Sequence, residues 1–187
     1  RDPARLLRVL TACPEELFDA LTRELETAMA AASDMAEAKS ALRRYKSAVA
    51  LLAALADLGG VWPVMTVTQV LTECAAASIA AAVRFLFRRA ATAGQWAPGD
   101  PAAPEAGSGF FVLAMGKQGA FELNYSSDID LIVFFDRDKA TFTGSGDLQS
   151  FFVRLTRDLV LLVEERTPEG YVFRTDLRLR PDAGATQ

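Results

Sequence analysis

The sequence predicts an α+β fold, in which a helical N-terminal region precedes a small mixed sheet. Apolar residues recur at helical spacing over residues 1–94, whereas residues 110–187 hold short apolar runs typical of strands. Residues 95–109 contain three prolines and three glycines, the composition of a linker or mobile loop. We therefore expect a helical extension, a linker and an α/β core, in that order.

Composition and charge narrow the class of protein. Of the 187 residues, 51% are apolar and 24% are charged, which is sufficient to build a buried core. The net charge of −4 leaves no excess of cations to attract nucleic acid. The longest apolar runs, at residues 48–56 and 75–83, are about half the roughly 20 residues that span a bilayer, and no signal peptide precedes them. The sequence thus predicts a soluble, cytoplasmic protein that binds neither nucleic acid nor a membrane.

Three helices are predicted in the N-terminal region. The first begins at Pro14, because proline suits the first position of a helix and two glutamates follow it near the positive helix end. The second starts at about Ser40 and ends at the glycine pair 59–60. The third is rich in alanine, takes Thr66 as its N-cap and continues towards Gly94. Helices with such small side chains pack closely into a bundle.

Three strands and one helix are predicted beyond the linker. The strands cover the apolar runs at residues 110–115, 128–135 and 171–179. Between the last two runs, leucine and phenylalanine side chains at helical spacing predict an amphipathic helix that begins near Asp147. The order strand, strand, helix, strand is that of a small α/β unit.

Histidine is absent from the whole sequence. Its absence excludes an imidazole general base, the serine and cysteine triads and imidazole zinc sites. Any metal chemistry must therefore use carboxylates, which favour hard cations such as Mg²⁺ or Mn²⁺. The two cysteines, Cys13 and Cys74, do not form a C-x-x-C pair and are predicted to be buried free thiols. The arginine pairs 43–44 and 88–89 are predicted to lie on exposed helix faces, with contacts to a partner as the alternative.

The candidate site is carried by the segment that joins the first two predicted strands. Asp128 and Asp130 stand two apart on a strand, so their carboxylates project from the same face and can bind a hard cation. The preceding turn contains Gly116 and Lys117 in a Gly-Lys-x-Gly sequence, which offers backbone amides and a positive charge to a phosphate group. Each motif alone also occurs in ordinary strands and turns. Their combination is more specific.

The third predicted strand adds charged side chains of both signs. Alternation along this strand places one aspartate and three arginines on a single face: Arg174, Asp176, Arg178, Arg180. These residues can complete a metal site next to guanidinium groups that bind phosphate. The alternative is a solvated face with Asp–Arg pairs, each of which contributes little to stability.

Residues 115–131 read Met-Gly-Lys-Gln-Gly-Ala-Phe-Glu-Leu-Asn-Tyr-Ser-Ser-Asp-Ile-Asp-Leu. This segment closely resembles the signature of the bacterial glutamine synthetase adenylyltransferase/adenylyl-removing enzymes. Segments 42–46, 55–60 and 174–181 are also similar to that family, so the resemblance spans most of the chain. Family members commonly show Leu-Gly-Gly after the lysine, whereas this sequence has Gln118-Gly119-Ala120. The loss of one glycine predicts a stiffer turn.

The resemblance implies a nucleotidyltransferase fold of the DNA polymerase β type, with residues 110–187 forming a core truncated on its C-terminal side. It implies that Asp128, Asp130 and Asp176 form an acidic triad that holds Mg²⁺ (or Mn²⁺). Contacts to nucleotide or phosphate are implied for a further set of residues: Gly116, Lys117, Ser127, Arg178, Arg180.

The resemblance also implies a function, which is Mg²⁺-dependent nucleotidyl transfer on glutamine synthetase in the control of nitrogen assimilation. The segment 173–182 is more similar to the family's N-terminal half, which removes AMP from an adenylylated tyrosine by phosphorolysis and yields ADP. Alternatives are the adenylylating half, which transfers AMP from ATP, a non-catalytic docking or regulatory module, and a nucleotidyltransferase with another substrate. The implied partners are glutamine synthetase, ATP or ADP, phosphate and a nitrogen-signalling regulatory protein.

Overall fold

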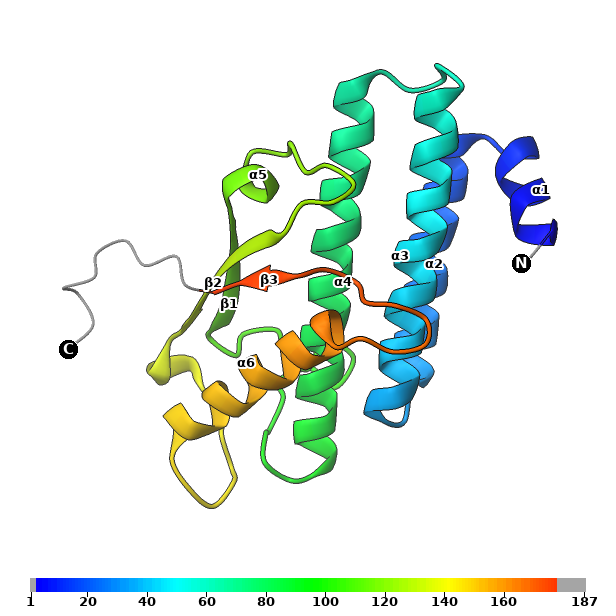
Figure 1. Ribbon diagram of the computed structural model, residues 1–187. Helices are drawn as coiled ribbons and strands as arrows, with labels where there is room; N and C mark the ends of the chain where they lie inside the picture. Colours follow the sequence, from blue (N-terminus) through cyan, green and yellow to red (C-terminus); the bar gives the residue numbers. More distant parts are fainter. Residues whose placement is uncertain (1–2, 178–187) are drawn as a thin grey trace.

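A helical bundle and a small sheet make up the protein, and a computed structural model describes residues 3–177 (Figure 1). Helices dominate the first half, and the strands follow in the second half. The elements in chain order are α1 (Pro3–Thr11), α2 (Pro14–Ala31), α3 (Met35–Leu58), α4 (Val64–Thr92), β1 (Phe110–Met115), α5 (Gly116–Gly119), β2 (Ile129–Phe135), the 3₁₀ helix η1 (Arg137–Lys139), α6 (Leu148–Glu164) and β3 (Thr175–Asp176). The α+β class predicted from the sequence is compatible with this arrangement.

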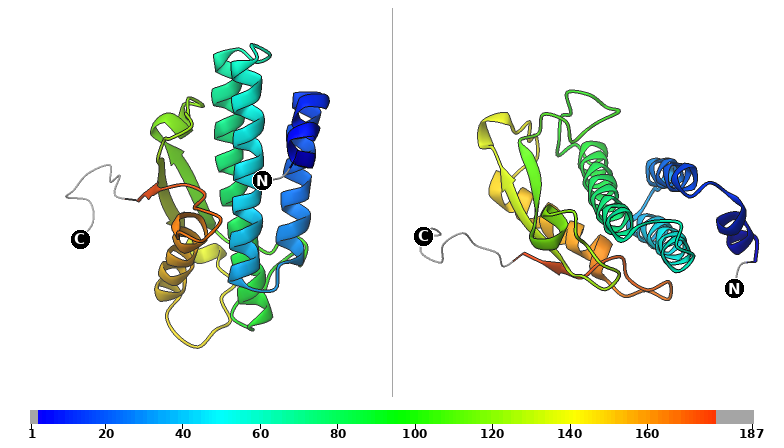
Figure 2. Two further views of the ribbon diagram at one scale, coloured as in Figure 1. Left: turned by 45° about the vertical axis from the view of Figure 1, so that its right-hand side comes forward. Right: turned by 90° about the horizontal axis from the view of Figure 1, so that it is seen from above.

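Helices α2, α3 and α4 lie side by side, and α1 stands on the outer side of this bundle (Figure 2). The helix α2 begins at Pro14 as predicted, and Leu17, Leu21 and Leu25 face the core. The helix α3 begins earlier than the predicted Ser40. Asp34 is its N-cap, and the carboxylate accepts hydrogen bonds from the amides of residues 36 and 37 at 2.8 and 2.9 Å. This cap adds more than one turn to the helix.

The helix α4 is the central element of the bundle. It is the one helix among residues 3–177 that is long and apolar enough to cross a membrane, but 67% of its most apolar window is buried within the fold. Its buried side chains contact both the other helices and the sheet. The apolar character of α4 is therefore that of a core helix. Its N-cap is Pro63, so the prediction that Thr66 caps this helix is wrong.

The sheet has the strand order β1-β2-β3, with β1 antiparallel and β3 parallel to β2. One face of β2 is buried through Ile129 and Leu131, which pack into the common core. The opposite face is more open, and Phe111 of β1 stacks there on its register partner Phe134 at 5.4 Å between ring centroids. Asp130 shares this face with Phe134, because the two residues are four positions apart on one strand.

Residues 95–109 pack against the core although the sequence predicts a linker or mobile loop there. Trp96 is 3% exposed and lies between aromatic rings of α4 and α6, stacked on Phe151 at 5.7 Å and edge-on to Phe87 at 5.0 Å. Its indole Nε1 donates to the carbonyl of Pro104 at 3.1 Å, which fixes the loop on itself. The helical part and the sheet consequently share one hydrophobic core.

One arginine of each pair caps a helix C-terminus and is at least partly buried, so the predicted exposure of both arginine pairs is partly wrong. Arg43 is 2% exposed, whereas its neighbour Arg44 lies on the surface. Arg88 is half-buried and donates from Nη2 to the carbonyls of Met29 and Ala32 at the end of α2. A cation is favoured there because the last carbonyls of a helix have no partner within the helix.

The two cysteines differ in exposure, so the prediction of two buried thiols is correct for Cys74 and wrong for Cys13. Burial raises the pKa of Cys74 to about 12, which suppresses the reactive thiolate. We expect a pulse of iodoacetamide to modify Cys74 at least about tenfold more slowly than Cys13 in the native protein. Mass spectrometry of the two peptides measures both rates. Unfolding in urea should make the rates similar, and equal rates in the native protein would contradict the burial of Cys74.

Candidate active site

The glycine-containing turn between β1 and β2 packs directly against one carboxylate. Gly116 follows β1 with φ +55°, and a Cβ at this position would lie 2.3 Å from Oδ2 of Asp130. A Cβ at Gly119 would lie 2.6 Å from the carbonyl oxygen of Ala114. Gly119 is therefore required by space against the backbone, and Gly116 is favoured by its positive φ and by its contact with the Asp130 side chain. Ala120 has φ −86°, a conformation open to any residue, so the glycine missing at this position relative to the family is not needed by the turn.

The two residues between these glycines, Lys117 and Gln118, differ in exposure to solvent. Lys117 is exposed, which leaves its ammonium group available to an anionic group in solvent. Gln118 is 4% exposed and packs beside β1 and α4, so it contributes to the support of the turn. Phe121, at the end of the turn, has φ +60°, which is strained for an aromatic residue. The backbone of this segment is thus held in an unusual path next to Asp130.

A second turn, closed by Asn124, leads into β2. The Oδ1 atom of Asn124 accepts hydrogen bonds from the Ser126 amide at 3.2 Å and from the Ser127 hydroxyl at 2.8 Å. Leu123 is fully buried and its amide donates to the Thr72 hydroxyl of α4 at 3.3 Å. Ser127 therefore closes the turn that immediately precedes Asp128. Its predicted contact with nucleotide or phosphate stays a prediction.

Asp128 forms an ion pair with an arginine of the neighbouring segment. The Nε atom of Arg174 lies 2.5 Å from Oδ1 of Asp128, and Nη2 of the same guanidinium donates to the carbonyl of Ser126 at 3.2 Å. Both side chains of the pair are more than half exposed, so it contributes little to stability in water. Its effect is to orient the Asp128 carboxylate.

Asp130 and Asp176 are register partners on adjacent parallel strands. Strand β3 contains only two residues, and the amide of Ile129 donates to the carbonyl of Arg174 at 2.9 Å just before it. On the opposite side of β3, the Thr175 hydroxyl donates to Glu164 of α6 at 3.1 Å. The predicted alternation is therefore present at Arg174 and Thr175, because Arg174 contacts Asp128 while Thr175 contacts the helix. The predicted strand 171–179 is shorter in the described residues.

The residue types suit a hard cation, because Mg²⁺ prefers oxygen ligands, Asp130 and Asp176 are register partners, and Asp128 lies two positions before Asp130. Within residues 3–177, no three acidic or thiol side chains lie close enough together to hold a metal ion as they stand. Asp128 is turned towards Arg174 in this arrangement. The shared metal site of Asp128, Asp130 and Asp176 therefore stays a prediction.

Two predicted phosphate contacts, Arg178 and Arg180, lie outside the described residues. A cavity of about 540 Å³ is lined by residues of α1, α2 and α3, and none of Asp128, Asp130 and Asp176 lines it. Sequence reasoning missed two sets of contacts that join α3 to the segments before β2 and β3. One is the hydrogen bond from the Tyr125 hydroxyl to Asp57 of α3, at 3.1 Å. The other is the set of hydrogen bonds from the buried Arg43 of α3 to backbone carbonyls of residues 162–170. The spacing of charged residues gave no signal for either contact, because both join distant parts of the chain.

The fold and the site together define an α+β protein with an acidic, glycine-lined site at one end of a small mixed sheet. The chain belongs to the glutamate-ammonia ligase adenylyltransferase family, which it matches over residues 1–187. It is 54% identical over 185 residues to the bifunctional glutamine synthetase adenylyltransferase/adenylyl-removing enzyme of Rhodopseudomonas palustris strain CGA009. The enzymes of the same name from Bradyrhizobium diazoefficiens and Xanthobacter autotrophicus are 53% and 51% identical. These alignments cover 99–100% of this chain but 19% of each relative, so the chain spans about a fifth of their length.

Proposed function

We propose that this chain carries a site for Mg²⁺-dependent nucleotidyl transfer on glutamine synthetase, the protein named in the description of its relatives. The observation that carries the proposal is the pairing of Asp130 with Asp176 across β2 and β3, with Gly116 packed against the Asp130 carboxylate. This arrangement places two carboxylates, suited to a divalent cation, beside a turn whose backbone amides can bind a phosphate group. The proposed core fold is that of the polymerase β-like nucleotidyltransferases.

Each residue has a defined role in this proposal. Asp128, Asp130 and Asp176 hold Mg²⁺ or Mn²⁺, which when bound neutralises the charge of phosphate oxygens. Gly116 allows the phosphate to approach the turn, and Lys117 adds a positive charge there. Three further residues contact nucleotide or phosphate in this proposal: Ser127, Arg178 and Arg180.

We infer that the reaction runs in the direction that removes AMP from an adenylylated tyrosine. An oxygen of hydrogen phosphate attacks the α-phosphorus, the bond from phosphorus to the tyrosyl oxygen breaks, and the proton of the hydrogen phosphate passes through solvent to the tyrosyl oxygen. ADP and the free tyrosine are the products. The attacking phosphate is already anionic, so no general base is required, which is consistent with a chain that contains no histidine. The adenylylating direction needs a base to deprotonate the tyrosine hydroxyl.

The test is the release of ADP from adenylylated glutamine synthetase by the full-length protein, with phosphate and Mg²⁺ present. We expect ADP release that depends on phosphate and is lost in the Asp128→Asn variant. Transfer of labelled AMP from ATP onto unmodified glutamine synthetase, lost in the same variant, would assign the opposite direction. Binding of glutamine synthetase with neither activity would contradict the proposal and indicate a docking module.

The proposed setting is the cytoplasm, where glutamine synthetase, ATP, ADP and phosphate are available together. A nitrogen-signalling regulatory protein is the further partner expected from the family. No membrane or nucleic acid takes part in the proposed reaction.

A further inference from the structure

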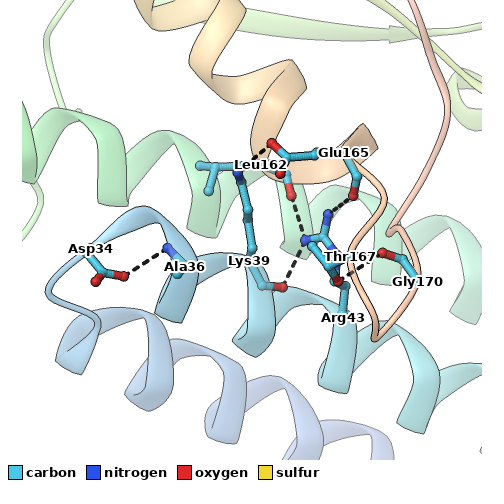
Figure 3. Close-up of polar contacts among 8 residues, drawn as sticks. All are labelled: Asp34, Ala36, Lys39, Arg43, Leu162, Glu165, Thr167 and Gly170. Atoms are coloured by element: carbon cyan, nitrogen blue, oxygen red, sulfur yellow. Dashed lines mark hydrogen bonds and ion pairs between the residues drawn. The ribbon is translucent and has the colours of Figure 1, made fainter.

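Arg43 is the largest side chain in the innermost part of the core, and it lies far along the chain from the acidic site. Its guanidinium donates to four backbone carbonyls, as Figure 3 shows. One is in its own helix, Lys39 at 2.9 Å, and the others follow one another around the end of α6. These are Leu162 at 3.0 Å, Glu165, and Gly170 at 2.8 Å.

The acceptors explain why a charged side chain is stable in this position. The last carbonyls of α6 have no partner within the helix and carry partial negative charge. The planar guanidinium presents several donors in fixed directions, so one side chain can bind carbonyls on both sides of the turn after α6. Lys39, one turn earlier on α3, adds an ion pair with the Glu165 carboxylate at 2.6 Å (Figure 3). The α3 helix is therefore joined to residues 162–170 by a set of polar contacts.

Residues 162–170 lead directly to the acidic site. The amides of Val172 and Phe173 both donate to the carbonyl of Val163, at 2.8 and 3.2 Å. After the turn, the chain therefore returns to pack against the C-terminal end of α6. Arg174 then contacts Asp128, and Asp176 pairs with Asp130. Asp176 is six positions after Gly170. Strand β3 has only two residues, so few hydrogen bonds to β2 hold it in place. Its position therefore depends on how residues 162–173, which precede it, are fixed to the rest of the fold.

We propose that Arg43 is a positioning residue for the acidic site, which it serves by fixing the segment that carries Arg174 and Asp176. The inference rests on the proposed function for its effect on catalysis. Its structural part, the anchoring of residues 170–176 by a side chain of the helical bundle, stands independently of that function. The helical region is, on this view, part of the architecture of the site.

The test compares three variants in the full-length protein. Arg43→Lys keeps the charge and loses the planar set of donors, and Arg43→Ala removes both. Arg44→Ala is the matched control, because Arg44 is the adjacent, exposed residue of the same helix. Hydrogen exchange, read by mass spectrometry, reports local opening of the peptides that cover residues 170–176 and of those that cover α2 to α4.

We expect exchange over residues 170–176 to accelerate roughly 10- to 100-fold in Arg43→Lys, because carbonyls at the end of α6 lose their partners. Exchange within α2 to α4 should match the wild type. Millimolar guanidinium chloride, far below denaturing concentrations, should restore protection in Arg43→Ala by occupying the vacated site. In the assay of ADP release, kcat should fall about 10- to 100-fold with KM for adenylylated glutamine synthetase unchanged. Arg44→Ala should change none of these quantities.

Two results would overturn the proposal. One is a folded Arg43→Lys protein with wild-type exchange over residues 170–176. The other is acceleration spread equally over the whole bundle without rescue by guanidinium, which is a general loss of stability. If the wild-type protein releases no ADP, the proposed function fails, while the exchange data still decide whether Arg43 anchors this segment.

Discussion

Replacement of Asp130 by asparagine is expected to lower kcat by about 1000-fold, because a catalytic metal contributes several kcal/mol and about 1.4 kcal/mol corresponds to a factor of ten. Asparagine has the size of aspartate, so the substitution removes charge without creating a cavity. Asp130 is the carboxylate that lies against Gly116 in the turn and is the register partner of Asp176 on β3. ADP release under saturating substrate measures the loss. Calorimetric titration with Mg²⁺ or Mn²⁺ measures metal affinity independently of turnover.

The matched control is Asp138→Asn. Asp138 lies in the 3₁₀ helix just beyond the same strand and is exposed. It loses the same charge at a position that no site residue contacts, so kcat and metal affinity should stay within about twofold of the wild type. If Asp130→Asn retained wild-type metal affinity and turnover, Asp130 would have no role in binding the cation.

Replacement of Gly116 by alanine is expected to lower kcat about 100-fold, because displacement of catalytic groups by about 1 Å has effects of this size. The new Cβ would lie 2.3 Å from the Asp130 carboxylate, well inside contact distance, so the turn and the carboxylate must move apart. The positive φ of +55° adds a backbone cost of about 1–2 kcal/mol. Urea unfolding measures the loss of stability, and the assay of ADP release measures the loss of turnover.

Gly107→Ala separates the two causes. Gly107 has φ +70°, and nothing lies within 4 Å of the Cβ that alanine would add. This variant should therefore show the backbone cost of about 1–2 kcal/mol and normal turnover. Equal turnover in Gly116→Ala and the wild type would mean that the turn does not position the Asp130 carboxylate.

The regular elements were largely predictable from local sequence. The strand at residues 110–115 has its predicted limits and the helix α6 begins after Asp147 as predicted, because a short apolar run and an N-cap aspartate are local signals. The start of α3 was missed although Asp34 is also a capping residue, since the apolar face used for the prediction begins later. Strand β3 is shorter than predicted within the described residues, because its ladder partner on β2 begins only at Ile129.

The residues of the candidate site were predictable from the sequence, whereas the contacts that hold them in place were not. The spacing of Asp128 and Asp130 and the alternation of Arg174 with Asp176 were visible as strand patterns. The ion pair between Asp128 and Arg174 required two segments far apart in sequence to meet. The same holds for Gly116, whose neighbour Asp130 is set by strand pairing. The polymerase β-like assignment and the metal triad remain predictions.

The sequence by itself determined the α+β class, the family and the residue types available for chemistry, because periodicity, motif and composition are local properties of the chain. Only the tertiary structure decided which charged side chains are buried and which backbone groups they bind. Arg43 and Arg44 are adjacent and chemically identical, yet one is 2% exposed and the other lies on the surface. The difference arises because three of the carbonyls that accept hydrogen bonds from Arg43 belong to α6 and the turn after it, more than a hundred residues away in the chain.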